Sequence, residues 1–404
     1  MAHPTGTFSW PRFIVSAYGP TLFSMIGYGA VLPLIALSAL RMGASVPLSA
    51  LITSFSSVGT ICGDLPASWL TVRLGERRAI ALACIWDAAW MATAFFAHNL
   101  VVLSVAIFAV GLSAAVFGLA RQSYITEMVP VKFRARALSS LGGTFRIGMF
   151  IGPVAGSGII AVWDLRTAYG FAALMSLVAA GVTMLLPDLP EETQGRRGGS
   201  KTGPRLFAVL RAHLRVLATL GTGIMFLGMI RAARQTVLPL WCESLGLDAS
   251  HTSLVYAASM AVDMSLFFVG GFIMDRFGRA WVVVPSMIIL GLGLAGLAIA
   301  HTVPVVIVAA VVLGFGNGIG SGVIMTLGSD ASPDVGRAQF LSGWRLLGDS
   351  GGAVGPVLLS AITALASLAV ATVAMGAVSV FGAAWLGYWI RRSDADSVHP
   401  PAES

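Results

Sequence analysis

Nine charged side chains interrupt segments of this sequence that are otherwise apolar. The acids are Asp64, Asp87, Asp263 and Asp349, and the bases are Arg121, Arg146, Arg231, Arg234 and Arg345. A charged group inside a long apolar segment is costly, so it faces protein or water rather than lipid. A carboxylate beside an arginine at low dielectric can change between an ion pair and a protonated acid as the geometry changes. These residues are therefore the candidates for moving a proton or holding a ligand.

A basic helix face is the second chemical feature. Arg231, Arg234 and Gln235 have the i, i+3, i+4 spacing that places three side chains on one face of a helix. If that face lines a cavity, it favours an anionic or carbonyl-rich ligand. The alternative is that the arginines anchor the helix near the outer surface or pair with acids on other helices. Further cavity candidates are Tyr28, Trp344 and Asp87.

Long apolar segments must position these residues. The chain is 56% hydrophobic and 11% charged, and its mean hydropathy is +0.85, which excludes an ordinary soluble domain. Segments of about 20 apolar residues, enough to cross a bilayer, follow one another along the chain. We predict helices near 13–40, 47–71, 79–98, 101–125, 138–162, 168–187, 214–240, 252–273, 281–301, 303–326, 339–364 and 367–390.

Charges outside these helices predict the orientation. Lysines and arginines are concentrated in alternate loops, whereas the intervening loops hold only Arg41 and Arg166. The positive-inside rule then predicts an integral plasma (inner) membrane protein with both termini cytoplasmic. The first ten residues lack the pattern of a signal peptide. The net charge of +7 thus reflects topology, and no nucleic-acid partner is expected.

The longest polar stretch divides the chain into halves. Residues 188–205 are rich in glycine, proline and charge, which is typical of a flexible linker. We predict an N-terminal six-helix bundle over 1–187, a cytosolic linker over 188–213, and a C-terminal six-helix bundle with a short tail over 214–404. The predicted fold class is an all-α membrane protein with two pseudo-symmetric bundles.

The two halves repeat at an offset of 203 residues. Matching positions include Glu127 and Asp330, Gly111 and Gly314, Gly152-Pro153 and Gly355-Pro356, and Arg73 and Gly75 with Arg276 and Gly278. Repeated halves in a membrane protein favour a transporter, which binds its substrate between them. The symmetry breaks where Asp275 corresponds to Val72, Arg146 to Asp349, Arg345 to Gly142, and Asp64 to Phe267. We expect the proton and ligand sites at such positions.

A loop motif resembles that of a known family. After the eighth predicted helix, the pattern G-x-x-x-D-R-x-G-R is formed by Gly271, Asp275, Arg276, Gly278 and Arg279. This pattern resembles the signature loop of the major facilitator superfamily. The first-half copy keeps Arg73 and Gly75 but has Ser68 and Val72 at the glycine and acid positions. The glycine permits a tight turn, and the arginines hold the loop at the inner surface.

The fifth predicted helix carries a second resemblance. Gly148, Gly152, Pro153 and Gly156 match most of the pattern G-x-x-x-G-P-x-x-G-G, with Ser157 at the last position. The pattern resembles the antiporter motif of drug and metabolite exporters of the same superfamily. A proline removes one helical hydrogen bond and glycines thin the helix, so this helix can bend or seal against a neighbour.

The resemblance implies the major facilitator fold, in which helices 2 and 11 and helices 5 and 8 face each other across the halves. Asp64 and Arg345 each lie eight residues from the predicted inner ends of their helices, and Asp263 and Arg146 each lie twelve residues away. Members of each pair thus share a depth in the membrane. We predict ion pairs Asp64–Arg345 and Asp263–Arg146 between the halves. Asp349, four residues after Arg345, can share that arginine.

These features together predict a secondary active transporter. The primary hypothesis is proton-coupled antiport, as efflux, of a small amphipathic organic compound by alternating access. The alternative is an importer or uniporter of a small metabolite, anionic if the Arg231 face lines the cavity. We expect a monomer whose partners are its small-molecule substrate, protons and the lipid bilayer.

An integral membrane enzyme is a further alternative, and a channel is disfavoured because the sequence has no filter-like loop. The six histidines and three cysteines are dispersed without metal spacing. No GxxxxGK[ST] stretch supports nucleotide binding. We therefore expect no catalytic residue, metal or cofactor.

Overall fold

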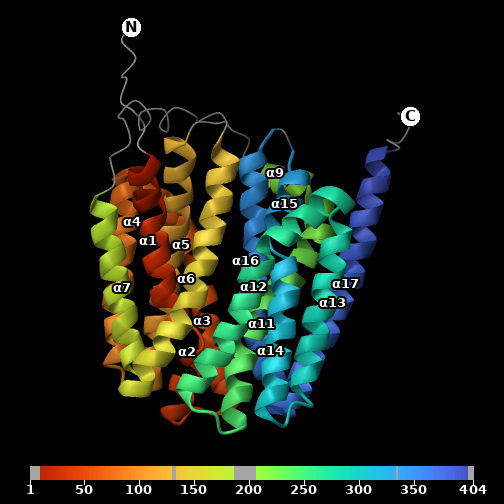
Figure 1. Ribbon diagram of the computed structural model, residues 1–404. Helices are drawn as coiled ribbons and strands as arrows, with labels where there is room; N and C mark the ends of the chain where they lie inside the picture. The colour runs from red at the N-terminus through yellow and green to blue at the C-terminus, as the bar shows by residue number, and fades with distance from the viewer. Residues whose placement is uncertain (1–9, 130–132, 186–205, 334, 399–404) are drawn as a thin grey trace.

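The computed structural model describes residues 10–129, 133–185, 206–333 and 335–398. Every regular element in these ranges is helical. The described residues include 12 helical segments that are long and apolar enough to cross a membrane, which confirms the predicted fold class. The helix that begins the described chain and the helix that ends it meet the same face of the molecule, called the terminal face below (Figure 1).

The helices divide into two bundles that stand side by side (Figure 1). The first bundle holds α1 Trp10–Val31, α2 Leu34–Arg41, α3 Val46–Leu74, α4 Glu76–Phe95, α5 Leu100–Met128, α6 Arg134–Val162 and α7 Thr167–Met184. The second holds α9 Leu206–Ala212, α10 Leu214–Val216, α11 Thr222–Ser244, α12 Ala249–Phe277, α13 Ala280–Leu297, α14 Val303–Ile319, α15 Val323–Asp330, α16 Arg337–Leu365 and α17 Leu368–Val398.

Some predicted helices are interrupted. The helix predicted near 13–40 divides into α1 and α2 at Pro33, which has no N–H to donate to the preceding turn. The helix predicted near 303–326 divides into α14 and α15, where Gly322 has φ +80°, a conformation that favours glycine. A π-helical turn, Leu217–Gly221, precedes α11. The predicted linker is partly helical because α9 lies within it, and residues 188–205 lie outside the described residues.

The repeat is visible in the helix boundaries. Both ends of α12 lie 203 residues after the ends of α3, and both ends of α16 lie 203 residues after those of α6. The turns that follow α3 and α12 also match, because Gly75 has φ +77° and Gly278 has φ +96°. These two glycines provide the tight turns expected of the loop motif.

Two equivalent glycines allow a close approach of two helices in each bundle. A Cβ atom on Gly111 of α5 would lie 2.0 Å from the backbone oxygen of Ser56 on α3. A Cβ atom on Gly314 of α14 would lie 2.2 Å from the backbone oxygen of Ser259 on α12. Small residues of this kind let membrane helices pack backbone to backbone. Equivalent residues, 203 positions apart, therefore make the same helix contact in both halves.

We expect Gly111→Ala to lower the free energy of unfolding by about 1–3 kcal/mol, because the added methyl group forces α3 and α5 apart. Gly158→Ala is the matched control, since a Cβ atom there would meet nothing within 4 Å. Denaturant unfolding in detergent measures both variants. Equal stability of the two variants would contradict this account of the α3–α5 contact.

The halves meet along two pairs of helices, α3 with α16 and α6 with α12. Hydrogen bonds join the halves toward the face opposite the terminal face: Thr53 to Thr236 at 2.9 Å, Ser157 to Ser250 at 2.8 Å, and Ser360 Oγ to Pro47 O at 2.7 Å. The pairing of helices agrees with the arrangement that the sequence resemblance implies.

Candidate functional site at the interface of the halves

Asp263 is the centre of a polar cluster between the bundles. It lies on α12 with 4% of its surface exposed. Arg146, from α6 of the first half, donates a hydrogen bond to Asp263 Oδ1. Asn317 Nδ2, from α14, donates to Oδ2 at 2.5 Å, and Arg234 Nη2 lies 3.6 Å from the same oxygen. The structure thus brings together Arg146 and Asp263, as their matched depths predict.

Two further contacts fix the arginines of α11. Arg234 is 2% exposed, and its Nη1 lies 3.3 Å from both Ser259 Oγ and the backbone oxygen of Leu313. Arg231 Nη2 donates to the backbone oxygen of Gly320 at 2.7 Å. Gly320 follows the last residue of α14. The interruption between α14 and α15 therefore presents a backbone carbonyl to a guanidinium group inside the membrane, an arrangement tolerated where backbone lines a polar interior.

The cluster has more positive than negative charge. Arg146 and Arg234 both lie against the carboxylate of Asp263, and both act electrostatically on the neighbouring Arg231. Among the described residues of this cluster, buried atoms without a hydrogen-bond partner are Arg231 Nε, Arg234 Nε, Tyr256 OH and Asn317 Oδ1. Buried polar atoms are nearly always hydrogen-bonded. A ligand with oxygen acceptors would satisfy the donors among them and compensate the excess positive charge.

The centre is where the repeat fails. In the first half, Tyr28 and Thr60 occupy the positions that correspond to Arg231 and Asp263. Tyr28 OH lies 3.4 Å from Ser56 Oγ, whereas the corresponding Ser259 meets Arg234. The scaffold is therefore symmetric, and the charged cluster is built almost entirely from the second half.

The other predicted pair is arranged differently. Arg345 Nε lies 3.5 Å from Asp349 Oδ2. Among the described residues, no ion pair to Asp64 lies within 4 Å. Arg345 reaches instead toward α5, where its Nη2 would be 3.7 Å from a Cβ atom on Gly118. Asp349 lies four residues after Arg345 on the same helix and is always within its reach. Arg345 therefore pairs with Asp349, although equal depth in the membrane predicted a pair with Asp64.

Comparison with known proteins supplies the family. The sequence profile of the Major Facilitator Superfamily matches residues 20–262 and 220–404. The chain belongs to the major facilitator superfamily. It is 23% identical over 320 residues to an uncharacterized MFS-type transporter, YhjO, of Bacillus subtilis (strain 168), with 78% of each chain covered. It is 20% identical over 386 residues to the cis,cis-muconate transport protein of Acinetobacter baylyi (strain ATCC 33305 / BD413 / ADP1), with 92% of each covered.

A solved structure of the superfamily agrees with the fold. The human organic anion transporter MFSD10 (TETRAN) matches with a TM-score of 0.66 at 16% identity, over 93% of this chain and 99% of that one. At this identity the match supports the fold alone. Superfamily membership points to a multi-pass membrane transporter rather than an enzyme.

The remaining cavity candidates lie outside the central cluster. Trp344 is 2% exposed, its Nε1 donates to the backbone oxygen of Ile324 at 2.8 Å, and its ring stacks on Phe340. Trp344 is therefore a packing residue, because its polar atom is already satisfied and its ring is covered. Asp87 contacts α5 and α7 inside the first bundle. Gln235 is partly buried on α11.

The residues of the superfamily loop motif make their contacts within the second half. Arg279 Nε donates to Asp330 Oδ2 at 2.9 Å, which joins the start of α13 to the end of α15. Asp275 lies 3.9 Å from Arg279 Nη1 and is largely exposed. Arg276 lies over the ring of Phe277. In the first-half copy, Arg73 lies over the ring of Trp69.

The glycine motif of α6 packs against α1 of its own half. A Cβ atom on Gly148 would lie 2.6 Å from Met25 Cβ, one on Gly152 would lie 2.5 Å from the oxygen of Ile26, and one on Gly156 would lie 3.2 Å from Ala30 Cβ. Pro153 lies inside α6 without ending it. The motif thus serves close helix packing, and its neighbour is within the first bundle.

Three members of the central cluster were not predicted from the sequence: Asn317, Tyr256 and Ser259. Each is a neutral polar residue in an apolar helix and so gives no charge signal. Of the three, Asn317 alone gave a signal in the sequence for a buried polar site, since an amide inside a glycine-rich apolar segment needs a hydrogen-bond partner.

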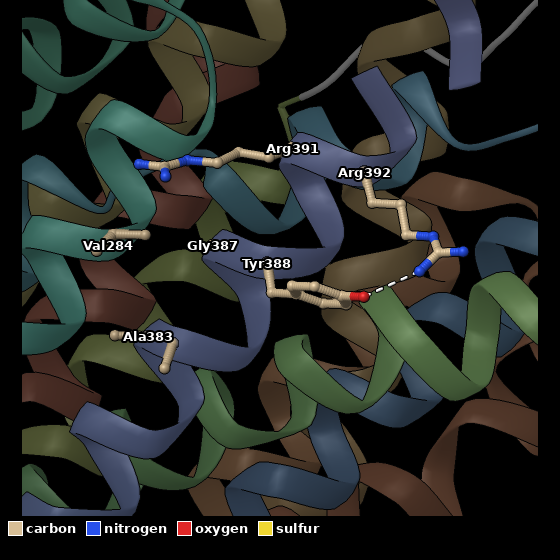
Figure 2. Close-up of a pocket in the computed structure, with 7 residues that line it drawn as sticks. Val284, Ala383, Gly387, Tyr388, Arg391 and Arg392 are labelled. Carbon is tan, nitrogen blue, oxygen red and sulfur yellow. Dashed lines mark hydrogen bonds between the residues drawn. The ribbon is translucent and has the colours of Figure 1, made fainter. Parts of the chain in front are cut away.

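A surface pocket of about 640 Å³ lies elsewhere, between α13 and α17 near the terminal face (Figure 2). Its lining includes Val284, Ala383, Gly387, Tyr388, Arg391 and Arg392. Figure 2 shows Arg391 extending toward the helix of Val284 and Arg392 donating to the Tyr388 hydroxyl. The pocket belongs to one half and contains no residue of the central cluster, so it is distinct from the candidate site.

Proposed function

We propose that this superfamily member is a proton-coupled secondary transporter of a small organic anion. The observation that carries the proposal is the central cluster, in which Arg146 and Arg234 pair with one carboxylate, Arg231 lies nearby, and two guanidinium Nε atoms have no partner. A carboxylate ligand accepts hydrogen bonds from guanidinium groups in a bidentate geometry. The anionic alternative of the sequence analysis is thus supported over a neutral amphipathic substrate.

Asp263 gives the anion a way to change the contact between the halves. Arg146 is held to Asp263 across the interface, so an anion that binds the arginines competes with this carboxylate. Competition weakens the link between α6 and α12, and a ligand that binds one conformation better shifts the population toward it. Alternating access follows when the halves rock about the central site.

The hydrogen bonds opposite the terminal face support a state whose binding site is reached from the terminal face. The positive-inside rule assigns that face to the cytoplasm. Export in exchange for protons is the direction that the α6 motif supports by resemblance. The muconate transport protein is a relative whose named substrate is a dicarboxylate, which is consistent with an anion here.

Proteoliposome counterflow tests the substrate class. We expect muconate or another small dicarboxylate to exchange, whereas its neutral diamide of similar shape does not, because the diamide lacks charge for the arginines. Equal exchange of the acid and the diamide would overturn the anionic proposal. Imposed pH gradients of either sign then separate proton antiport from symport and from uniport.

A further inference from the structure

A carboxyl group without a basic partner lies inside the first bundle. Asp87, on α4, meets Ser113 Oγ of α5 at 3.2 Å and Ser176 Oγ of α7 at 2.5 Å. Among the described residues, no lysine, arginine or histidine forms an ion pair with it. Asp87 is partly buried, and a carboxylate that is shielded from water is disfavoured unless it is paired or well hydrogen-bonded. Asp87 therefore differs from Asp263 and Asp349, which both meet arginines.

The hydrogen count around Asp87 fits a protonated acid. A serine hydroxyl has one hydrogen to donate. Ser113 Oγ lies 2.7 Å from the backbone oxygen of Val110, which is closer than its 3.2 Å distance to Asp87 Oδ1. If Ser113 donates to Val110, a carboxylic acid at Asp87 donates its own proton to Ser113 while Ser176 donates to Oδ2. The ionised form would keep one good donor and leave Oδ1 poorly satisfied.

Few other titratable groups surround Asp87. Cys84 on the same helix and Tyr28 on α1 interact with it electrostatically. From α5 and α7, the side chains that contact it are Ser113 and Ser176, which do not titrate. Asp64, for which the described residues also show no ion pair, experiences the positive charge of Arg345. Of the four acids inside the predicted spans, Asp87 is thus the one whose described environment depends least on an arginine.

Tyr28 connects this acid to the central cluster. It interacts electrostatically with Asp87 and with Tyr256. Tyr256 in turn interacts with Arg234 and Asp263, and its hydroxyl has no partner. Tyr28 is therefore near both Asp87 and Tyr256 at the edge of the anion site, and the two acids do not contact each other directly.

We propose that Asp87 is the proton-binding group of the transport cycle. It takes a proton from water on one side of the membrane, which forms one O–H bond, and releases the same proton to water on the other side. Asp263 then pairs with the arginines and competes with the anion for them, whereas Asp87 binds the proton. This proposal rests on the proposed proton-coupled transport and assigns the proton to a residue outside the anion site.

Asp87→Asn, which mimics the neutral acid, is the first test. We expect loss of anion accumulation driven by a pH gradient, together with loss of a carboxylic-acid C=O band from the infrared spectrum at neutral pH. Thr93→Val on the same helix is the matched control, because Thr93 donates only to its own helix at Ala89. The infrared readout needs no substrate, so it separates failure of this assignment from failure of the anion proposal.

Ser176→Ala is the second test and leaves the acid in place. Loss of the donor to Oδ2 disfavours the ionised form, so we expect the pH midpoint of transport to rise by about one unit. Ser104→Ala on α5, where Ser104 donates to Leu100 O, should leave the midpoint unchanged. The proposal is overturned if Asp87→Asn keeps pH-driven accumulation, whether or not the infrared band is lost. If Asp87→Asn does not fold, an unshifted midpoint in Ser176→Ala overturns it.

Discussion

Replacing Arg231 by glutamine is expected to lower the affinity for organic anions by about 10- to 100-fold, the worth of one charge-assisted hydrogen bond. Arg231 is held by a single hydrogen bond to Gly320 O, and its Nε is buried without a partner. Glutamine retains a donor for the Gly320 carbonyl and removes the charge. Binding of a labelled dicarboxylate to the purified protein measures the effect.

Two variants make this test specific. Arg231→Lys keeps the charge but lacks the forked geometry of the guanidinium group, so we expect an intermediate affinity. Arg215→Gln removes an exposed arginine of α10 and should leave the affinity unchanged. Equal binding by Arg231→Gln and the parent protein would remove Arg231 from the anion site. A matching loss in Arg215→Gln would indicate a general effect of protein charge.

The repeat and the spans were predictable because they rest on hydropathy and on glycines with fixed geometry. The predicted segments 47–71 and 252–273 fall inside α3 and α12, whose ends differ by the same offset. The division of α14 from α15 was missed because the apolar pattern continues through it. Its cause is the conformation of Gly322, which a hydropathy pattern does not contain.

The central site was predictable where charge and depth both give a signal. Arg146 and Asp263 lie on long helices, so counting residues from the helix ends gives their depth. The same count for Asp64 and Arg345 could not show that Asp349, one turn away, competes for the arginine. Tyr256 and Asn317 are neutral, and their role depends on which helix faces converge, which one sequence does not specify.

Replacing Asp263 by asparagine is the second substitution with a large expected effect. We expect the free energy of unfolding to fall by about 3–5 kcal/mol, because removing one partner of a buried ion pair leaves uncompensated charge. Here the remaining charges are Arg146 and Arg234, which lie against Asp263 in the parent protein. Anion binding should compensate them, so a saturating dicarboxylate should restore more stability to this variant than it adds to the parent.

A double-mutant cycle isolates the contact between the halves. In Arg146→Gln, Asp263 keeps Arg234 and Asn317, so we expect a smaller loss, about 1–3 kcal/mol. The double variant should lose less than the sum of the single losses by about 0.5–3 kcal/mol, because Arg146 has no carboxylate to lose once Asp263 is replaced. Asp164→Asn provides the control cycle with Arg146→Gln, since Asp164 pairs with Arg41 in another part of the first half. Additive losses in the Asp263 cycle would mean that the Arg146–Asp263 bond contributes nothing to holding the halves together, and the link between anion binding and their separation would fail with it.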